Sequence, residues 1–419
     1  MILVALATLA LAVGSGCGAG AHAPAPAHAS ARPPVAARAS ATPRACLSRA
    51  PSGEQISHAL AVADARLNAD TRALTPGEFP SVTNRSGHWR LSRRSGWTSG
   101  FFPGSLWLTD RSAGRPSLAA AARAWTAALA PQAAVTTSHD IGFEIFTSFG
   151  NGYRVTHDDA YRRVILQAAA SLATRYDPAV GAVRSWGSRG DNAHFLVIVD
   201  GLMNLQLLFW AARHGGSSDW TQMAVRSALT VREHFMRPDG SLVHLVDFNP
   251  ITGAVQAKGN PQGYDLASTW ARGQAWAVAG FTIAYGETHD PRFLDAAHRT
   301  AAYFLGHLPS DCVPYWDFQA PGIPHAPRDS SAAAIAADGL ASLSRLDPDP
   351  ARRTAERRAA GALLAALISH DLAGHGQALL AHATSNKPGG NSNTGTSYGD
   401  YYFLDALQRY RAALAAARG

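Results

Sequence analysis

A single aspartate, Asp200, lies inside an almost unbroken apolar stretch of the chain. Between positions 195 and 210 only four residues interrupt the apolar run: Asp200, Gly201, Asn204 and Gln206. The run is too long for one strand, so it predicts a helix over residues 193–214 that is apolar on most faces. Burial disfavours the charged form of a carboxyl group and raises its pKa, as a general acid working near neutral pH requires. Asp200 is therefore the first catalytic candidate. The alternative is a buried aspartate that caps a helix or pairs with an arginine.

A second carboxylate, Asp140, lies sixty residues upstream of Asp200, in the segment SHDIGFEIF. In a ring of six helical hairpins of about sixty residues each, this spacing places the two carboxylates on neighbouring inner helices. Two carboxylates in one cavity, one dry and one better hydrated, divide the acid and base roles in sugar-bond chemistry. Asp140 is expected as the partner of Asp200, with a helix N-cap as its alternative role.

A third group of candidates shares one predicted helix, residues 266–287. Ser268, Arg272 and Trp276 stand at positions i, i+4 and i+8, which places them on one face. An arginine above a tryptophan would clamp a carboxylate beside a stacking platform. A structural ion pair between Arg272 and an aspartate explains the arginine equally well.

Further candidates lie outside this helix. Trp97, in GWTSGFFPG, would supply a second aromatic wall, although a lone tryptophan also suits the core. His244 and Gln262 precede the helix and carry donors that can hold hydroxyl groups or water. Metal and phosphate sites are not expected, because the sequence holds no HExxH, CxxC or GxxxxGK motif and its 17 histidines show no ligand spacing.

Helices must position these residues, because helical segments alternate with Gly-rich loops and strand alternation is rare. Twelve helices are predicted, at residues 55–67, 100–109, 117–129, 139–149, 159–176, 193–214, 220–235, 266–287, 291–308, 330–346, 350–372 and 401–416. The helices that carry the candidates are rich in Gly, Ala and aromatic residues, whereas 159–176 and 350–372 carry Arg and Asp on one face. An inner ring of apolar helices inside an outer amphipathic ring fits this alternation. The predicted fold is therefore all-α, an (α/α)6 toroid in one domain, residues 46–419.

The composition is globular, with 47% hydrophobic and 16% charged residues. The formal net charge of +7 favours anionic partners. Nucleic acid is not expected among them, because the basic residues are scattered or lie on helix faces.

Residues 1–17 resemble a secretion signal that ends at a lipidated cysteine, Cys17. Residues 18–45 are rich in Ala and Pro and hold almost no large apolar residue, so a flexible linker is expected. The protein is therefore expected outside the cytoplasm, with a membrane contact only through the lipid on Cys17. In an oxidising compartment Cys46 and Cys312 could pair, and two isolated thiols are the alternative.

Six segments spread over most of the chain together resemble the unsaturated glucuronyl hydrolases of glycoside hydrolase family 88. In chain order they are GWTSGFFPG, HDIGF, IVDGLMNL, STWARGQAW, DSSAAAIAADGL and GDYYFLDAL. The resemblance implies an (α/α)6 barrel without metal or cofactor. It also implies oligosaccharide substrates that carry a 4,5-unsaturated uronate at the non-reducing end.

The resemblance implies roles for single residues as well. Asp200 matches the family's acid/base catalyst, and Asp140 matches its second essential carboxylate. The family's substrate-contacting positions correspond to Trp97, His244, Gln262, Arg272 and Trp276, and Ser268 joins them from its predicted helix face. Ser385 and Lys387, in HATSNKPGG, match the segment that in some members reads the neighbouring sugar and its sulfate.

The candidate residues suit such a substrate. A 4,5-unsaturated uronate is a vinyl ether, so protonation of C4 leaves a cation at C5 that the ring oxygen stabilises. Asp200 would donate this proton and then act as base on the water that adds at C5, while Asp140 orients the water. The resulting hemiketal opens and the glycosidic bond is lost. Arg272 would neutralise the uronate carboxylate, and Trp97 and Trp276 would sandwich the flattened ring.

Three alternative functions remain open on the sequence. Unsaturated rhamnogalacturonyl hydrolases share the barrel and the chemistry but act on pectin fragments. A sugar epimerase on the same barrel would need histidine pairs as proton shuttles where this sequence has carboxylates. A lipid-anchored carbohydrate-binding protein would keep the tryptophans and Arg272 but have no use for Asp200. The oligomeric state is also left open.

Overall fold

The structure, a computed structural model, describes residues 45–113 and 116–417 of the 419-residue chain. These residues belong to one compact unit that spans residues 42–419. The predicted secretion signal, Cys17 and nearly all of the predicted linker lie outside the described residues. In the described part, no helix has both the length and the apolar character needed to cross a membrane.

Twelve α-helices in the described residues follow the order of the twelve predicted helices. Their bounds are α1 Gly53–Ala73, α2 Phe101–Ala113, α3 Pro116–Ala128, α4 Asn151–Thr156, α5 Asp159–Ala173, α6 Gly201–Arg213, α7 Asp219–Phe235, α8 Ala271–Thr288, α9 Pro291–Gly306, α10 Ser330–Leu346, α11 Pro350–Ala366 and α12 Ser397–Ala416. Helix α4 continues a π-helical segment, η3, which spans Gly142–Gly150. The segment predicted at 139–149 is therefore mainly a π-helix, with i→i+5 hydrogen bonds in place of the i→i+4 bonds of an α-helix.

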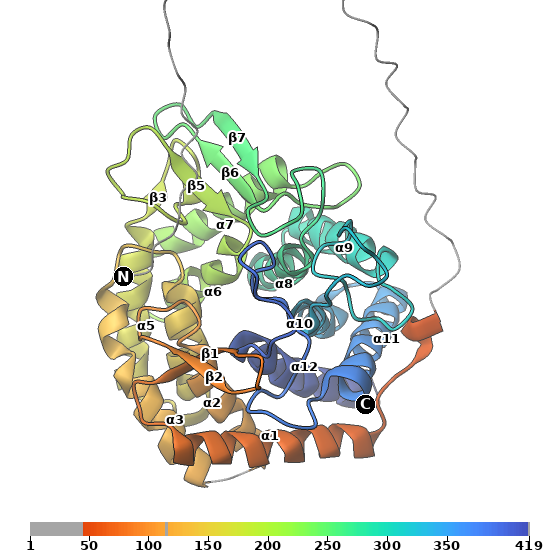
Figure 1. Cartoon of the computed structure of the whole chain (residues 1–419). Helices are drawn as coiled ribbons and strands as arrows, with labels where there is room; N and C mark the ends of the chain where they lie inside the picture. The colour runs from red at the N-terminus through yellow and green to blue at the C-terminus, as the bar shows by residue number, and fades with distance from the viewer. Residues whose placement is uncertain (1–44, 114–115, 418–419) are drawn as a thin grey trace, which may run out of the picture. The chain divides into compact units, whose positions relative to one another are not determined.

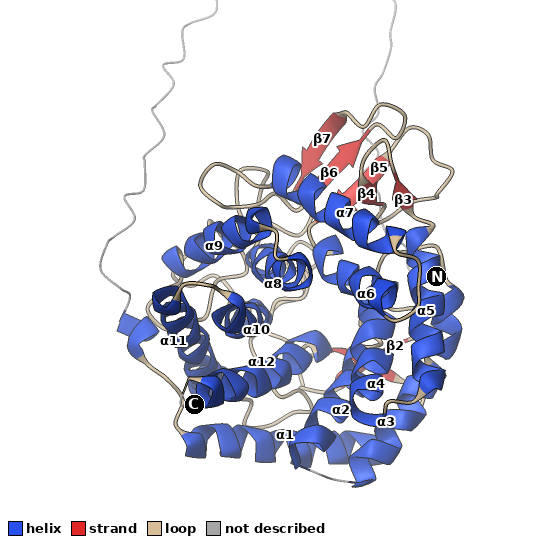
Figure 2. Ribbon diagram, turned by 180° about the vertical axis from the view of Figure 1, so that it is seen from behind, coloured by secondary structure: helices blue, strands red, loops and turns tan. Residues whose placement is uncertain are grey.

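The helices form two concentric rings (Figures 1 and 2). In the inner ring each segment contacts the next and the last contacts the first, in the order α2, η3, α6, α8, α10, α12. The helices between them in sequence, α3, α5, α7, α9 and α11, pack outside, and α1 packs against α2 and α3. This alternation of inner and outer helices confirms the predicted (α/α)6 toroid.

Several outer helices begin at side chains that cap them. The hydroxyl of Ser52 accepts a hydrogen bond from the backbone N–H of Gln55 at the start of α1. The carboxylates of Asp158, Asp290 and Asp349 do the same for α5, α9 and α11. In α9 and α11 a proline follows the cap, where its missing N–H leaves no helical bond unmade. The sequence thus fixes where these helices start.

The inner helices pack closely because small residues face one another. Helix α10 carries the segment 332–337, in which every side chain is fully buried. At Gly339 a Cβ atom would lie 2.9 Å from the Cα of Ala279 in α8, so a larger residue would push the two helices apart. The Ala- and Gly-rich composition of the inner helices therefore permits the tight ring.

The N-terminal ends of the six inner segments meet at one end of the ring. The ring of Trp97, just before α2, lies 4.9 Å from that of Tyr398 at the start of α12. Arg272, at the start of α8, forms an ion pair with the N-cap aspartate of α10. Phe143 in η3 donates its backbone N–H to the side chain of Asn204 in α6. The residues that open the inner helices are thereby brought into one neighbourhood.

Seven short strands, which were not predicted, lie at this end of the ring in the described residues. The strands are β1 Phe79–Thr83, β2 Trp89–Ser92, β3 Tyr176–Asp177, β4 Ala182–Val183, β5 Phe195–Ile198, β6 Leu245–Phe248 and β7 Val255–Gly259. Strands β1 and β2 pair in one antiparallel hairpin, and β3 and β4 in another. Strands β5, β6 and β7 form an antiparallel sheet in that order.

One predicted helix is shorter than expected, because strand β5 occupies its first part. The helix expected over 193–214 begins only at Gly201, and its first part is the strand, with Phe195 opposite Phe248 of β6. A continuous apolar run shows no periodicity that would distinguish a buried strand from a buried helix. For this reason β5 and α6 were predicted as a single helix. Helix α8 likewise begins at Ala271 and not at Leu266.

A disulfide joins Cys46, near the start of the described chain, to Cys312 in the loop before α10, with the two Cα atoms 5.8 Å apart. The pairing that the sequence left open is therefore present. The bond closes a loop across a sequence separation of 266 residues. A cross-link over so long a loop restricts the unfolded chain strongly.

Replacing both cysteines, as Cys46→Ala with Cys312→Ala, should lower the free energy of unfolding by about 2–5 kcal/mol, because the unfolded chain regains its loop entropy. Chemical denaturation with and without a reductant measures the effect. The reductant should destabilise the native sequence and leave the double variant unchanged. Equal stability of the oxidised and reduced native protein would contradict the prediction.

Candidate active site

Asp200 lies at the corner between β5 and α6, as the N-cap residue of that helix. Its side chain makes no capping hydrogen bond. Its Oδ2 atom is buried and has no hydrogen-bond partner among the described residues. Neither alternative role, a helix cap or an arginine pair, is seen for Asp200 in the described chain. A buried carboxylate oxygen without a partner is uncommon in folded proteins and calls for an explanation, of which a catalytic role is one.

His244 provides the nearest polar neighbour of that carboxylate. Its Nε2 atom lies 3.6 Å from Oδ2 of Asp200, and the imidazole is fully buried. Neither of its ring nitrogens has a hydrogen-bond partner in the described part of the chain. The ring packs against Trp270 and Trp186, with centroid distances of 4.5 and 6.3 Å. Packing therefore holds the imidazole in place while its nitrogens stay available to a hydroxyl group or a water molecule.

Asp140 lies just before η3, with its side chain 19% exposed. Ser138 donates its hydroxyl to Oδ2 at 2.7 Å, and Nε2 of His139 lies 3.3 Å from Oδ1. Burial alone raises the pKa of Asp140, but the charge and hydrogen bond of His139, the Ser138 hydroxyl and the charge of Arg175 outweigh burial. The pKa of Asp140 therefore falls below its usual value, so the group is ionised at neutral pH. The N-cap position of η3 belongs to Ile141, which excludes the capping role for Asp140.

Close contacts hold the starts of η3 and α6 side by side. Oδ1 of Asn204 accepts the backbone N–H of Phe143 at 2.7 Å. A Cβ atom on Gly142 would lie 2.5 Å from the same oxygen, so glycine is required for this approach. The Nδ1 atom of His139 lies 3.4 Å from the place that a Cβ on Gly201 would take. The two candidate carboxylates thus open neighbouring inner helices, as their spacing in the sequence predicted.

The guanidinium of Arg272 is committed to the protein itself. Its Nη1 donates to Oδ2 of Asp329 at 2.9 Å and to the carbonyl of Thr384 at 2.5 Å. Its Nη2 donates to Oε1 of Gln262 at 2.9 Å and to the carbonyl of Ser385 at 2.7 Å. With Arg272 only 1% exposed, no terminal N–H remains for a uronate carboxylate. The alternative ion pair with an aspartate is present, and a uronate clamp, which stays a prediction, would need some of these bonds to be exchanged for bonds to the substrate.

Arg272 instead positions other candidates. Because Oε1 of Gln262 accepts from the guanidinium, the amide N–H groups of this partly exposed side chain point elsewhere and can donate to a substrate. The same guanidinium anchors the backbone at Ser385, which leaves the serine hydroxyl to interact with a ligand. Lys387 follows two residues later and is partly exposed. These three side chains belong to one neighbourhood organised by the buried arginine.

Ser268 does not belong to that neighbourhood as a ligand contact. It precedes α8, so it does not share a helix face with Arg272 and Trp276. Its hydroxyl donates to Oδ2 of Asp317 at 2.7 Å and accepts the backbone N–H of Asp265 at 3.0 Å. Because Ser268 is also only 1% exposed, its predicted role in substrate binding is wrong and its role is structural.

The two tryptophans predicted to sandwich the sugar differ in accessibility. Trp97 is partly exposed and packs on Tyr398 and Phe143, with centroid distances of 4.9 and 5.6 Å. Trp276 is fully buried, and its ring lies 5.3 Å from Phe143 and 5.2 Å from Tyr402. Trp276 therefore packs among other aromatic side chains in this structure, and its stacking on a sugar stays a prediction. Trp97 remains available to stack on a sugar.

Other residues of this site were not found from the sequence. His139 stood beside Asp140 in the same motif but was not singled out. Trp186, partly exposed beside His244, lies in a stretch without helical or strand periodicity. Asp329 carried a local signal, because an aspartate before an Ala-rich helix is a typical N-cap. Its ion pair with an arginine in another helix has no local signal.

Together these groups can carry out acid–base chemistry on a sugar. Asp140 is ionised, whereas Asp200 has an uncommitted oxygen beside an uncommitted imidazole. Carboxylates in such different surroundings can separate the delivery of a proton from the activation of water. Trp97 offers an aromatic face and Gln262 offers donors, which are the groups that bind sugar rings and hydroxyls.

Known proteins share this fold and sequence. An unsaturated glucuronyl hydrolase of Formosa agariphila is 40% identical over 318 residues, which cover 75% of this chain and 79% of that protein. An unsaturated chondroitin disaccharide hydrolase of Streptococcus pyogenes serotype M1 is 32% identical over 370 residues, which cover 86% of this chain and 92% of that protein. No family model matches the sequence.

A solved structure agrees with the sequence relatives. The crystal structure of an unsaturated glucuronyl hydrolase specific for heparin superposes with a TM-score of 0.83 at 35% identity, covering 87% of this chain and 99% of that one. Similarity of this extent in both sequence and fold confirms the predicted family. The chain therefore belongs to the unsaturated glucuronyl hydrolases, glycoside hydrolases that act on unsaturated uronic acid.

Proposed function

We propose that this protein removes the 4,5-unsaturated uronate from the non-reducing end of oligosaccharides produced by polysaccharide lyases, with Asp200 as the acid. The observation that carries the proposal is the pair of carboxylates at the starts of η3 and α6, of which Asp140 is partly exposed and Asp200 is buried with an oxygen that has no partner among the described residues. Membership in the family supports the reaction type. The pair gives that reaction a proton donor and a second, ionised carboxylate.

In the proposed reaction the proton of Asp200 goes to C4 of the vinyl ether. The positive charge that forms at C5 is shared with the ring oxygen. Water adds at C5 and gives its proton to Asp200, which is now the base, while ionised Asp140 orients the water. The product is a hemiketal, which opens and releases the rest of the oligosaccharide. His244, 3.6 Å from the acid, would hold a sugar hydroxyl or the water during these steps.

The substrate is proposed to be of the glycosaminoglycan type. The names of two relatives mention a chondroitin disaccharide and heparin, which are glycosaminoglycans or fragments of them. Lys387 and the Ser385 hydroxyl are the groups proposed to meet the neighbouring sugar and its sulfate, because a lysine is a compact cation on a flexible stem. Arg272 donates a hydrogen bond to the backbone carbonyl of Ser385. This bond would keep Ser385 and Lys387 at a fixed distance from the residues that bind the uronate.

A panel of unsaturated disaccharides tests the proposal. The protein is incubated with chondroitin, hyaluronan, heparin and rhamnogalacturonan disaccharides, and the ultraviolet absorbance of the double bond is followed. Loss of absorbance with a glycosaminoglycan substrate is the expected result. Loss with the rhamnogalacturonan fragment alone would assign the pectin-directed activity instead. Binding without loss on every substrate would reject hydrolysis and leave a carbohydrate-binding protein.

The pH profile of the reaction depends on His139. A lowered pKa keeps Asp140 ionised, so kcat/KM should fall on the acid side only below the usual aspartate pKa of about 3.9. In His139→Asn the largest effects that offset the burial of Asp140 are lost and only those of Ser138 and Arg175 remain, so this acid limb should move to higher pH. Measuring kcat/KM from pH 3 upward locates the limb. An unmoved limb would show that another group sets it.

We also propose that the protein works outside the cytoplasm, secreted or anchored through a lipid on Cys17. The disulfide between Cys46 and Cys312 supports this, because disulfides persist mainly in oxidising compartments. Mass spectrometry of the protein from separated cell fractions should find a lipid-modified Cys17 at the mature N-terminus in the membrane fraction. In Cys17→Ala the protein should lose its membrane anchor. An intact N-terminus on cytoplasmic protein would contradict export.

A further inference from the structure

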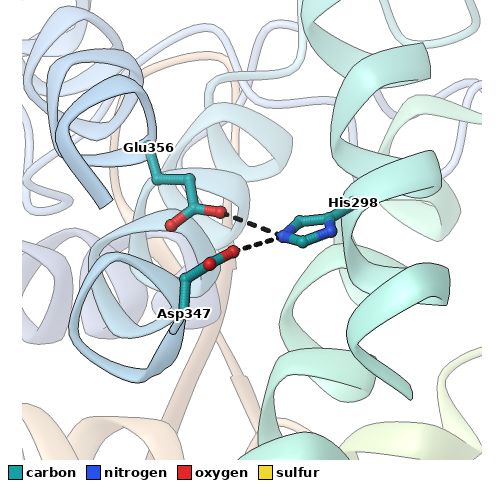
Figure 3. Close-up of side chains that lie close together, drawn as sticks. All are labelled: His298, Asp347 and Glu356. Atoms are coloured by element: carbon teal, nitrogen blue, oxygen red, sulfur yellow. Dashed lines mark hydrogen bonds and ion pairs between the residues drawn. The ribbon is translucent and has the colours of Figure 1, made fainter. Parts of the chain in front are cut away.

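Three ionisable side chains, none of them among the residues described above, converge between neighbouring elements of the ring (Figure 3). His298 comes from α9, Asp347 follows the last residue of α10, and Glu356 comes from α11. Nε2 of His298 lies 2.5 Å from Oδ2 of Asp347 and 3.4 Å from Oε1 of Glu356. One ring nitrogen therefore meets two carboxylates from two other elements.

The backbone fixes the direction of Asp347. Its other oxygen, Oδ1, accepts the backbone N–H of Asp349 at 2.7 Å. Arg353 donates to the carbonyl of Asp347 at 3.0 Å. Asp347 itself is only 2% exposed. Oδ2 is thereby held toward the histidine by the turn between α10 and α11.

His298 cannot donate a full hydrogen bond to both Asp347 and Glu356, because one ring nitrogen faces both carboxylates. Nη1 of Arg352 lies 2.6 Å from Nδ1 of His298, and a guanidinium only donates, so Nδ1 accepts and the single ring proton sits on Nε2. That proton is shared with the nearer oxygen, of Asp347. Glu356 is 8% exposed, and its Oε2 is buried without a hydrogen-bond partner in the described chain. A buried carboxylate oxygen without a partner is costly, and a cation bound beside Glu356 would offset this cost.

We propose that His298, Asp347 and Glu356 bind a divalent first-row transition metal ion such as Zn²⁺. Each residue offers one ligand atom, and these atoms all lie within 4.8 Å of one another, so side-chain shifts would bring all three within about 2.0–2.2 Å of a single ion. One imidazole with two carboxylates is a donor set that suits this class of metal, whereas Ca²⁺ prefers oxygen ligands alone. The site borders a surface hollow of about 590 Å³, which leaves room for water to complete the coordination.

Binding needs one local rearrangement that conserves protons. The proton of His298 moves from Nε2 to Nδ1, so Nε2 can coordinate the metal and the imidazole stays neutral. Arg352 must then turn away from Nδ1. Its side chain is 55% exposed and already lies 3.8 Å from Asp349, so it can move toward that carboxylate. Two carboxylates then balance the two charges of the ion.

The ion would act as a cross-link. It would join α9 to the turn between α10 and α11, which the histidine now bridges with one hydrogen bond. The expected role is structural, because the ligands come from outer helices and a turn and none of them is a candidate for the sugar site. The readouts of this site are therefore affinity and thermal stability.

Calorimetric titration of ZnCl₂ into the chelator-treated full-length protein tests the proposal. One ion per chain should bind, and at a free Zn²⁺ concentration of 100 times Kd the Tm should rise by about 3 °C. His298→Gln and Glu356→Gln should each weaken binding by about 100-fold and abolish this shift. Asp295→Asn is the matched control, because Asp295 lines the same hollow but is not a ligand. Circular dichroism and the Tm in chelator establish that each variant is folded.

The outcomes separate cleanly. Absence of saturable Zn²⁺ binding below millimolar concentration would overturn the proposal. Stoichiometric binding that His298→Gln leaves unchanged would assign the ion to other histidines and would overturn it as well. Ca²⁺ binding as tight as Zn²⁺ binding would exclude the transition-metal class. Loss of binding in both ligand variants with retention in Asp295→Asn is the result that supports it.

Discussion

Asp200→Asn is expected to lower turnover by about 10³-fold or more, because the amide cannot donate the proton that starts hydration of the double bond. Substrate affinity should change little, since asparagine keeps the size of the side chain and its place beside His244. Single-turnover rates give the chemical step, and equilibrium titration with an unsaturated disaccharide gives Kd. The two measurements together distinguish a lost acid from a lost binding contact.

The control for this substitution is Asp159→Asn. Asp159 lies in the first turn of α5 with its side chain 69% exposed, so the same chemical change there removes a charge far from any candidate group. Turnover of that variant should equal that of the native protein. Substantial residual turnover in Asp200→Asn would show that the proton comes from elsewhere.

Arg272→Met is expected to lower the free energy of unfolding by about 3–5 kcal/mol, because Asp329 would remain buried at 0% exposure without its partner. Activity should fall through KM, since Gln262 and the backbone at Ser385 lose their common anchor. A lost substrate hydrogen bond worth about 1.4 kcal/mol would raise KM about tenfold. Denaturant unfolding and steady-state kinetics measure the two effects separately.

Two companion variants test the explanation. Asp329→Asn in the Arg272→Met background removes the unpaired charge and keeps the helix cap, so it should recover part of the lost stability. Arg272→Lys keeps a charge for Asp329 but cannot reach four acceptors, so it should remain stable and still show a raised KM. If the methionine variant were as stable as the native protein, the ion pair would not be the reason for burying Arg272.

The ring of helices could be predicted because its signals are local. Apolar periodicity locates a helix, and a capping residue such as Asp290 marks where it begins. The alternation between Ala/Gly-rich and amphipathic segments then separates inner from outer helices. For the same reason the sixty-residue spacing of Asp140 and Asp200 was enough to place them on neighbouring inner helices.

The failures have a common physical cause, which is that side-chain partners are set by tertiary contacts. Nothing near Arg272 in the sequence indicates that Asp329, Gln262 and two backbone carbonyl groups will use its four terminal N–H groups. How deeply a side chain is buried also cannot be told from the sequence. Trp97 and Trp276 were therefore given the same predicted role, although only Trp97 is partly exposed. Ser268 was misplaced because the helix starts five residues later than expected, at Ala271 and not at Leu266, which removes Ser268 from the shared face.

The meeting of six inner helix starts at one end of the ring has an electrostatic consequence. Each helix carries a macrodipole equivalent to roughly half a positive charge at its N-terminus. Six of them aimed at one place create a positive potential that attracts a carboxylate through peptide groups alone. This potential can therefore attract an acidic sugar even while the guanidinium of Arg272 is bonded within the protein. Arg272 can then hold the surrounding loops in position.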